Sequence, residues 1–213
     1  MKDEARRDPA PSAHLYNFMA KKRKNFDKRI AEEVASRIKE ERLLDVGTEP
    51  GFIPIEVAKM NQNLGVWGID ISKTMIKLAK KNAVRAGVDN VKFEIMSAYD
   101  LKFQEEHFDL IMSFGALHHF RDPLRVFNEA YRVLKPCKEA WFYDFITDVS
   151  RKELKEFLNG LNLPYFPRGI AFRLHGLKYR EWEIIKRRAE ESRFREFELK
   201  KENALMKLIL RKD

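Results

Sequence analysis

The sequence predicts an α/β protein whose seven-stranded, mostly parallel sheet is doubly wound and ends in an antiparallel hairpin. Three observations predict this class. Short apolar runs alternate with segments whose apolar residues recur at helical spacing. The run Leu-Leu-Asp-Val at residues 43–46 leads directly into a glycine-containing turn and a helix. The last two apolar runs, at residues 194–199 and 205–210, follow each other closely enough to pair as a hairpin.

The parallel part of the sheet is expected to come from five apolar runs that alternate with helical segments. Each run has the length of a strand, and helical connections between strands place those strands parallel to one another. The five runs lie at residues 43–46, 66–69, 91–96, 108–114 and 140–144.

Five helices are expected from apolar residues at spacings of three and four. Ser72 offers a side-chain oxygen to cap the third helix, and Gly87 ends it because glycine readily takes a left-handed conformation. The expected helices span residues 26–41, 52–60, 73–86, 124–134 and 179–191. The inward faces of the last two are Leu124, Phe127, Ala130, Tyr131 and Leu134, and Trp182, Ile185 and Ala189.

Composition and length bound the possibilities. A chain of 213 residues suits one domain, residues 1–213, with an N-terminal arm at 1–24 and an insertion at 150–178. No apolar run is long enough to span a membrane, and the charged, proline-containing N-terminus is unlike a secretory signal, so we expect a cytoplasmic protein. The single Cys137 excludes an internal disulfide. Many charged residues and only two glutamines are typical of thermophilic proteins.

The net charge of +9 could attract a nucleic acid or an anionic substrate. Charge spread along helix faces more often serves solubility alone.

The glycine turn after the first strand predicts a ligand site at the carboxyl end of the sheet. A dinucleotide requires Gly-x-Gly-x-x-Gly, but Glu49 and Phe52 occupy the second and third glycine positions. The Glu49 carboxylate would oppose a pyrophosphate, whereas a cofactor with a sulfonium and an ammonium meets no such repulsion. The turn therefore favours S-adenosylmethionine over NAD.

Here the chain resembles the class I S-adenosylmethionine-dependent methyltransferases, in particular the small-molecule, ubiquinone/menaquinone-methyltransferase-like members. Asp45, Gly47 and Gly51 match their (D/E)-x-G-x-G-x-G motif, while Glu49 replaces its middle glycine. The resemblance implies a Rossmann-like sheet, S-adenosyl-L-methionine as cofactor, and cofactor contacts from these four residues. It also implies that the N-terminal arm covers the cofactor, with Tyr16 as a contact.

Asp70 ends the second strand 25 residues after Asp45, near the spacing of about 20 expected for an acid that binds ribose hydroxyls. The alternative is that Asp70 caps the next helix, a role that Ser72 can already fill. If Asp70 binds the ribose, Ile71 beside it would lie against the adenine.

Further residues are implied by the resemblance alone. The loop after the third strand grips the adenine in these enzymes, which implicates Ser97, Ala98 and Tyr99, with Ser97 in place of the usual acid. The fourth strand and the Gly-Ala-Leu-His-His-Phe segment after it resemble the next motif, which implicates Ser113 and Phe114. The helix that follows usually closes with Lys-Pro-Gly-Gly. Because Cys137 replaces the first of these glycines, we expect that turn to avoid positive backbone angles.

His118 and His119 are the candidate catalytic residues, because a histidine near neutral pKa can take a proton from an acceptor. A purely structural role in the loop is the alternative, and at most one of the two adjacent rings is expected to face the substrate. No spacing of His, Cys and carboxylate residues suggests a metal site.

The proline- and aromatic-rich stretch at 150–178 is the expected substrate cover, since loops over a rigid sheet vary with substrate. Shielding of the sheet edge is an equal alternative. Its candidate substrate residues are Phe166, Arg168, Phe172, Arg173 and His175.

The favoured function is methyl transfer to an oxygen, nitrogen or carbon atom of a small molecule by in-line displacement, in a monomer or homodimer. The alternatives are an RNA or protein methyltransferase that docks through its basic surface, and a cofactor-binding module without activity. A NAD-dependent reductase is the weakest reading.

Overall fold

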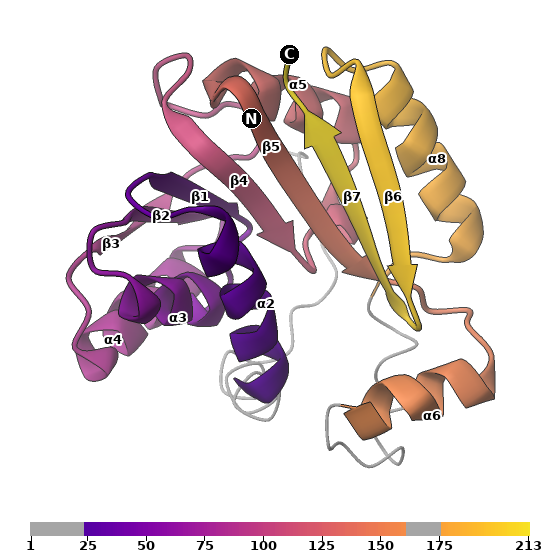
Figure 1. Ribbon diagram of the computed structural model, residues 1–213, viewed down its shortest axis with the longest axis horizontal. Coiled ribbons are helices and arrows are strands. Elements are labelled where there is room, and N and C mark those ends of the chain that lie inside the picture. Colours follow the sequence, from indigo (N-terminus) through magenta and orange to yellow (C-terminus); the bar gives the residue numbers. More distant parts are fainter. Residues whose placement is uncertain (1–23, 161–175) are drawn as a thin grey trace.

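The structure is a computed structural model that describes residues 24–160 and 176–213. Its core is a sheet with the strand order β3-β2-β1-β4-β5-β7-β6 (Figure 1). The first five strands of the chain run parallel, and β7 pairs antiparallel with both β5 and β6. The strands are β1 Arg42–Val46, β2 Gly65–Asp70, β3 Val91–Ile95, β4 Phe108–Phe114, β5 Leu134–Phe145, β6 Glu196–Glu202 and β7 Leu205–Arg211. The predicted Rossmann-like sheet and its C-terminal hairpin are confirmed.

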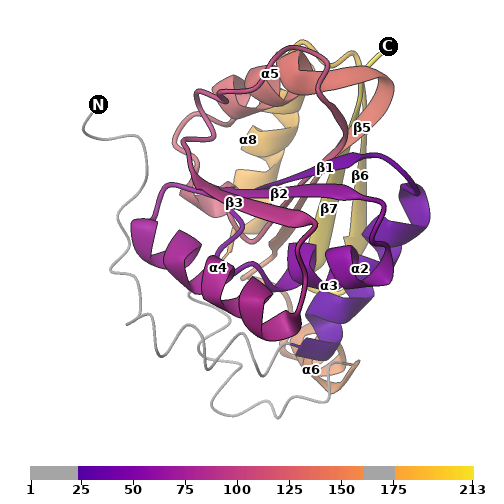
Figure 2. The ribbon, with the colours of Figure 1, turned by 90° about the vertical axis from the view of Figure 1, so that its left-hand side faces the viewer.

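Helices cover both faces of the sheet, and Figure 2 shows the two layers. One face carries α2, α3 and α4, and the opposite face carries α5 and α8. Because β4 is covered on both sides, all seven of its residues are buried, which is why it reads as an apolar run rather than an alternating one. The helices are α2 Lys24–Arg37, α3 Phe52–Met60, α4 Lys73–Ala86, the 3₁₀ turn η1 Leu117–His119, α5 Pro123–Val133, α6 Arg151–Gly160 and α8 Tyr179–Glu190.

Local signals set the helix boundaries. The Ser72 hydroxyl accepts a hydrogen bond from the Met75 amide at 3.4 Å, and Gly87 ends α4 with φ +68°. The Asp122 carboxylate accepts from a backbone amide in the first turn of α5, and Pro123 starts the helix, where a missing N–H costs nothing. The predicted cap and stop of α4 are therefore confirmed.

Phenylalanine rings connect α2 to the centre of the sheet. The Phe26 ring centroid lies 5.4 Å from that of Phe114 in β4 and 5.8 Å from that of Phe157 in α6. The same cluster includes Phe145 at the end of β5. Tilted and edge-on aromatic pairs of this kind stabilise beyond the area that they bury. They place α2 and α6 on the same side of the sheet, close to the carboxyl ends of β4 and β5.

Several predicted boundaries are wrong. The first helix ends at Arg37 rather than near residue 41. The segment expected to cover the substrate begins with the helix α6, which buries Leu154, Phe157 and Leu158, and its role as a cover stays a prediction. In α5 the buried residues are Pro123, Val126, Phe127, Ala130 and Val133, so the inward stripe differs from the predicted one.

The turn after α5 also differs from prediction, because Cys137 has φ +59°. The fifth strand begins at Leu134 instead of residue 140 and pairs with Phe108 there; pairing resumes between Glu139 and Leu110. Between these two pairings β5 advances by five residues and β4 by only two, so the additional residues of β5 must form a bulge. Cys137 takes a left-handed angle within this bulge, although it is not glycine.

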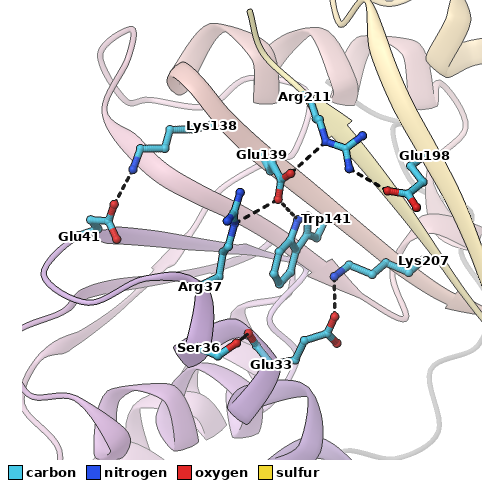
Figure 3. Close-up of polar contacts among 10 residues, drawn as sticks. All are labelled: Glu33, Ser36, Arg37, Glu41, Lys138, Glu139, Trp141, Glu198, Lys207 and Arg211. Carbon is cyan, nitrogen blue, oxygen red and sulfur yellow. Dashed lines mark hydrogen bonds and ion pairs between the residues drawn. The ribbon is translucent and has the colours of Figure 1, made fainter.

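Ion pairs join α2 to the C-terminal strands on the outer part of the sheet (Figure 3). Lys207 Nζ lies 2.6 Å from Glu33 Oε1 and 3.3 Å from the centroid of the Trp141 ring. Glu33 also accepts a hydrogen bond from the Tyr143 hydroxyl at 3.1 Å. Burial lowers the pKa of Lys207, and the Glu33 carboxylate opposes this effect. Glu33 therefore compensates a cation that the fold holds largely away from water.

Glu139 is the centre of a second group in Figure 3. Its carboxylate accepts from Trp141 Nε1 at 2.9 Å and from Arg211 Nε at 3.1 Å, and it lies 3.4 Å from Arg37 Nε. Arg211 also donates to Glu198 in β6 at 2.8 Å. These contacts connect α2 with β5, β7 and β6.

Within residues 24–160 and 176–213, no helix has both the length and the apolar character that crossing a bilayer requires.

We predict that Glu33→Gln lowers the free energy of unfolding by about 1–2 kcal/mol, because it removes the carboxylate that pairs with the buried Lys207 ammonium. Glu32→Gln is the matched control. Glu32 is the neighbouring acid on α2 and forms only an exposed pair with Lys28 at 3.6 Å, so its loss should cost less than about 0.5 kcal/mol. Urea denaturation followed by circular dichroism measures both, and equal effects would contradict this role for Glu33.

Candidate functional site

The turn between β1 and α3 carries three left-handed residues in alternation: Gly47 with φ +76°, Glu49 with φ +54° and Gly51 with φ +76°. The amides of Gly47 and Thr48 both donate to the Ile69 carbonyl, at 2.9 and 2.8 Å. The turn is thereby fastened to the end of β2. It lies at the carboxyl edge of the parallel strands, where sheets of this kind bind ligands.

Both glycines of the turn are required by close packing. A Cβ on Gly47 would lie 2.5 Å from the Cβ of Ala116, in the loop after β4. A Cβ on Gly51 would lie 2.6 Å from the Phe93 ring and 3.0 Å from the Ala79 Cβ. A side chain at either position would also strain the left-handed backbone. Because both positions lack a Cβ, the turn forms a backbone cradle at residues 47–51 that packs closely against the loop after β4, β3 and α4.

Asp70 connects this cradle to the next helix. Its Oδ2 accepts from the Glu49 amide at 3.0 Å, and its Oδ1 accepts from the Ser72 amide at 2.8 Å. Burial raises the pKa of Asp70, and these two hydrogen bonds partly lower it again. Each carboxylate oxygen has a second acceptor position, so Asp70 can still receive hydroxyl donors. The predicted alternative, a cap on α4, is also part of its role, because Asp70 and Ser72 both bind amides there.

Acidic side chains line a small hollow beside the cradle. Burial raises the pKa of Asp45 to about 7, and the charge of Asp70 also acts to raise it. The pKa of Glu49 is raised well above its usual value by burial and then by the charges of Asp70 and Asp144. The residues that line the hollow are Asp45, Gly47, Thr48, Glu49, Pro50, Phe52, Ile53 and Phe114.

Two acids in a buried hollow suit a ligand with positive charge and repel a pyrophosphate. The cradle and its acids therefore fit the sulfonium and ammonium of S-adenosylmethionine, and they do not fit a dinucleotide.

His118 and Asp144 form a pair that spans two strand ends. Asp144 Oδ2 is 2.9 Å from both the backbone nitrogen and the Nδ1 atom of His118. Asp144 is wholly buried at the end of β5, and its Oδ1 accepts from the Phe145 amide at 2.8 Å. The His119 ring lies against the His118 ring, with centroids 3.9 Å apart. The Asp144 carboxylate therefore fixes the orientation of the His118 ring.

Asp144 is not among the site residues predicted from the sequence, although a signal for it was present. Like Asp45 and Asp70, Asp144 is an acid at the carboxyl end of a parallel strand. The other lining residues that were not predicted, Thr48 and Phe52 among them, carry no chemical signal of their own.

The loop after β3 holds the predicted adenine residues close to α5. The Ser97 hydroxyl accepts from the Tyr99 amide at 3.2 Å. The Tyr99 hydroxyl accepts from the Arg121 amide at 2.8 Å and the Asp122 amide at 3.4 Å, so its polar end fastens the loop that follows η1. Ala98 is half-buried between them. Their contacts with adenine stay a prediction.

The remaining predicted residues are spread more widely. Ser113 is wholly buried within β4, and its Oγ makes no hydrogen bond within the described part of the chain. Phe114 lines the hollow, and Ile71 is exposed beside Asp70. The predicted lid and substrate residues lie outside the described residues: Tyr16, Phe166, Arg168, Phe172, Arg173 and His175. Among the side chains that the structure does describe, no cluster of three His, Cys, Asp or Glu could hold a metal ion.

Comparison with known proteins agrees with this geometry. A family profile described as a methyltransferase domain matches residues 38–158. The ubiquinone/menaquinone biosynthesis C-methyltransferase of Rickettsia felis is 33% identical, over 48% of this chain and 48% of that protein. The chain spans about half the length of the curated relatives it matches.

Solved structures share the fold. A Methanococcus maripaludis protein superposes with a TM-score of 0.78 at 21% identity, covering 94% of this chain and 91% of that one. Phosphoethanolamine N-methyltransferase 2 of Haemonchus contortus, crystallised with S-adenosyl-L-methionine, superposes with a TM-score of 0.60 at 22% identity, covering 81% and 37%.

These findings confirm the resemblance that the glycine turn suggested. The matched profile covers more than half of the sequence. The chain therefore belongs to the methyltransferase domain family.

Proposed function

We propose that this methyltransferase acts on a small-molecule acceptor that must lose a proton, with His118 as the base. The observation that carries the proposal is the 2.9 Å contact between His118 Nδ1 and Asp144 Oδ2. A carboxylate that accepts from Nδ1–H leaves the lone pair of a neutral imidazole on Nε2. Asp144 is then a positioning residue that also stabilises the imidazolium once His118 has taken the proton.

The cofactor supplies a methyl group on a positively charged sulfur, which leaves as a neutral thioether when a nucleophile attacks in line. The leaving group is thus already activated, and the protein contributes mainly by holding the acceptor at near-attack geometry. The Asp70 carboxylate would bind the ribose hydroxyls, and the cradle from Gly47 to Gly51 would hold the amino-acid tail. Ser97 to Tyr99 would contact the adenine.

The relatives support a small acceptor. The Rickettsia protein is a C-methyltransferase of quinone biosynthesis, and the Haemonchus enzyme is a phosphoethanolamine N-methyltransferase. The acceptor atom differs between them, while a small acceptor is common to both. The candidates Phe166, Arg168, Phe172 and His175 are proposed to select the acceptor in this chain.

We predict that saturating S-adenosyl-L-methionine raises the melting temperature of the wild-type protein by about 3–6 °C, since a ligand that binds only the folded state stabilises it. Asp70→Ala should lose most of this shift, measured against the melting temperature of the same variant without ligand. Asp100→Ala is the control, because Asp100 is an exposed acid paired with Lys102. An undiminished shift in Asp70→Ala would remove the ribose role.

We also predict that His118→Ala lowers methyl transfer to the acceptor by about 10²-fold or more, the usual contribution of a general base, whereas His119→Ala has less than tenfold effect. Transfer of a radioactive methyl group to a small-molecule extract provides the assay.

Asp144→Asn should change the tautomer of His118, seen in long-range ¹H–¹⁵N NMR spectra of the imidazole. A merely structural Asp144 would leave that spectrum unchanged.

A second candidate, an RNA acceptor, is favoured by α4. Its exposed surface carries five cations and no acid, and in the described part of the chain none of the five forms an ion pair. Each pair of like charges four residues apart, such as Lys73 and Lys77, destabilises a helix by about 0.2–0.5 kcal/mol. A bound polyanion would offset this cost. The five are Lys73, Lys77, Lys80, Lys81 and Arg85.

If this second candidate is right, the protein is retained on an RNA column and its retention falls steeply with salt. The double variant Lys77→Gln/Lys81→Gln should elute at clearly lower salt than wild type. Lys186→Gln/Arg187→Gln removes the same charge from α8 and should elute later than the α4 variant. Equal elution of both variants would show that only net charge matters, which contradicts an RNA site on α4.

A further inference from the structure

Glu49 occupies a position whose backbone conformation glycine adopts with less strain. Its φ of +54° lies in the left-handed region, and the cofactor motif of the family has glycine there. A side chain that is kept at a strained position in a functional loop suggests that the loop uses it. At position 49 this sequence therefore departs from the family motif.

The Glu49 carboxylate lies between the two loops of the site. Its Oε1 is 3.9 Å from the position that a Cβ on Gly115 would occupy, so it reaches the start of the loop after β4. Its own amide is held by Asp70, and its side chain lines the hollow together with Asp45 and Phe114. The charge of Asp144, which pairs with His118, also acts on Glu49, so the carboxylate lies near the strand end that holds the proposed base.

The groups around Glu49 are mainly acidic. Asp45 on β1, Asp70 on β2 and Asp144 on β5 all lie at the same edge of the sheet, with His118 on η1 beside Asp144. The charges of Asp70 and Asp144 raise the pKa of Glu49, in addition to the effect of burial. Binding of a positively charged ligand stabilises the ionised carboxylates of these acids, whereas binding of a neutral ligand does not.

We propose that the Glu49 carboxylate makes the site select the cationic methyl donor over the product that remains after transfer. In the reaction the bond between sulfur and the methyl carbon breaks, its electron pair stays on sulfur, and the methyl group bonds to the acceptor. The cofactor loses one positive charge, so its attraction to Glu49 falls when transfer is complete. Glu49 thus favours donor binding and product release. This inference rests on the cofactor site proposed above.

The test is isothermal titration calorimetry with three ligands: S-adenosyl-L-methionine, S-adenosylhomocysteine, and sinefungin, which carries an ammonium near the position of the sulfonium. The proteins are wild type, Glu49→Gln, and Glu56→Gln, a control that removes an acid of α3 paired with Lys59 at 2.7 Å. We expect Glu49→Gln to weaken both cationic ligands about tenfold, and to weaken the product, which keeps the ammonium of the tail but has no charge on sulfur, by about threefold or less. The control should change none of the three by more than about twofold.

Glu49→Gly checks that the effect is not a folding defect, since glycine fits the left-handed angle and removes the same charge. It should melt no lower than wild type and show the same loss of selectivity as Glu49→Gln. Equal weakening of all three ligands, or no change in any, would overturn the role of Glu49 while leaving the cofactor site intact. A wild-type protein that binds none of the three would overturn both the role and the site.

Discussion

The Asp70 carboxylate is the interaction on which the site depends. By accepting the Glu49 amide of the β1–α3 turn and the Ser72 amide at the start of α4, it fixes two loops whose amides are 23 residues apart in the sequence. Because Gly47 and Gly51 lack a Cβ, the turn also packs closely against Ala116, Phe93 and Ala79. One half-buried acid and two glycines therefore fix the turn beside the hollow, and Asp45 and Glu49 give the hollow its negative character.

Most of the fold was predictable because burial on both faces leaves a plain signal in the sequence. The apolar run of β4 and the glycine that ends α4 appear at the predicted residues. Asp70 was a site candidate for a different reason: an acid directly after a buried strand, at a suitable distance from a glycine turn, suggests a ribose ligand beside its role as a helix cap. Its contact with the turn amide was not predicted, because that contact needs β1 and β2 side by side.

The missed features depend on contacts between distant segments. The pair of His118 and Asp144 requires β4 and β5 to be neighbours, which single-strand patterns do not specify. The left-handed angle of Cys137 comes from the unequal advance of these two strands and not from its own preference. Likewise α6 is amphipathic in sequence, but the prolines and aromatics that follow it suggested a loop.

Cys137 also offers a practical consequence. It is the single cysteine of the sequence, it is exposed, and it lies near the start of β5, whereas the site lies at that strand's other end. Eight residues of strand separate Cys137 from Phe145, a span of roughly 26 Å if fully extended. A thiol-reactive dye or surface linker would therefore attach at one known point, remote from the pocket, and report on events there without blocking them.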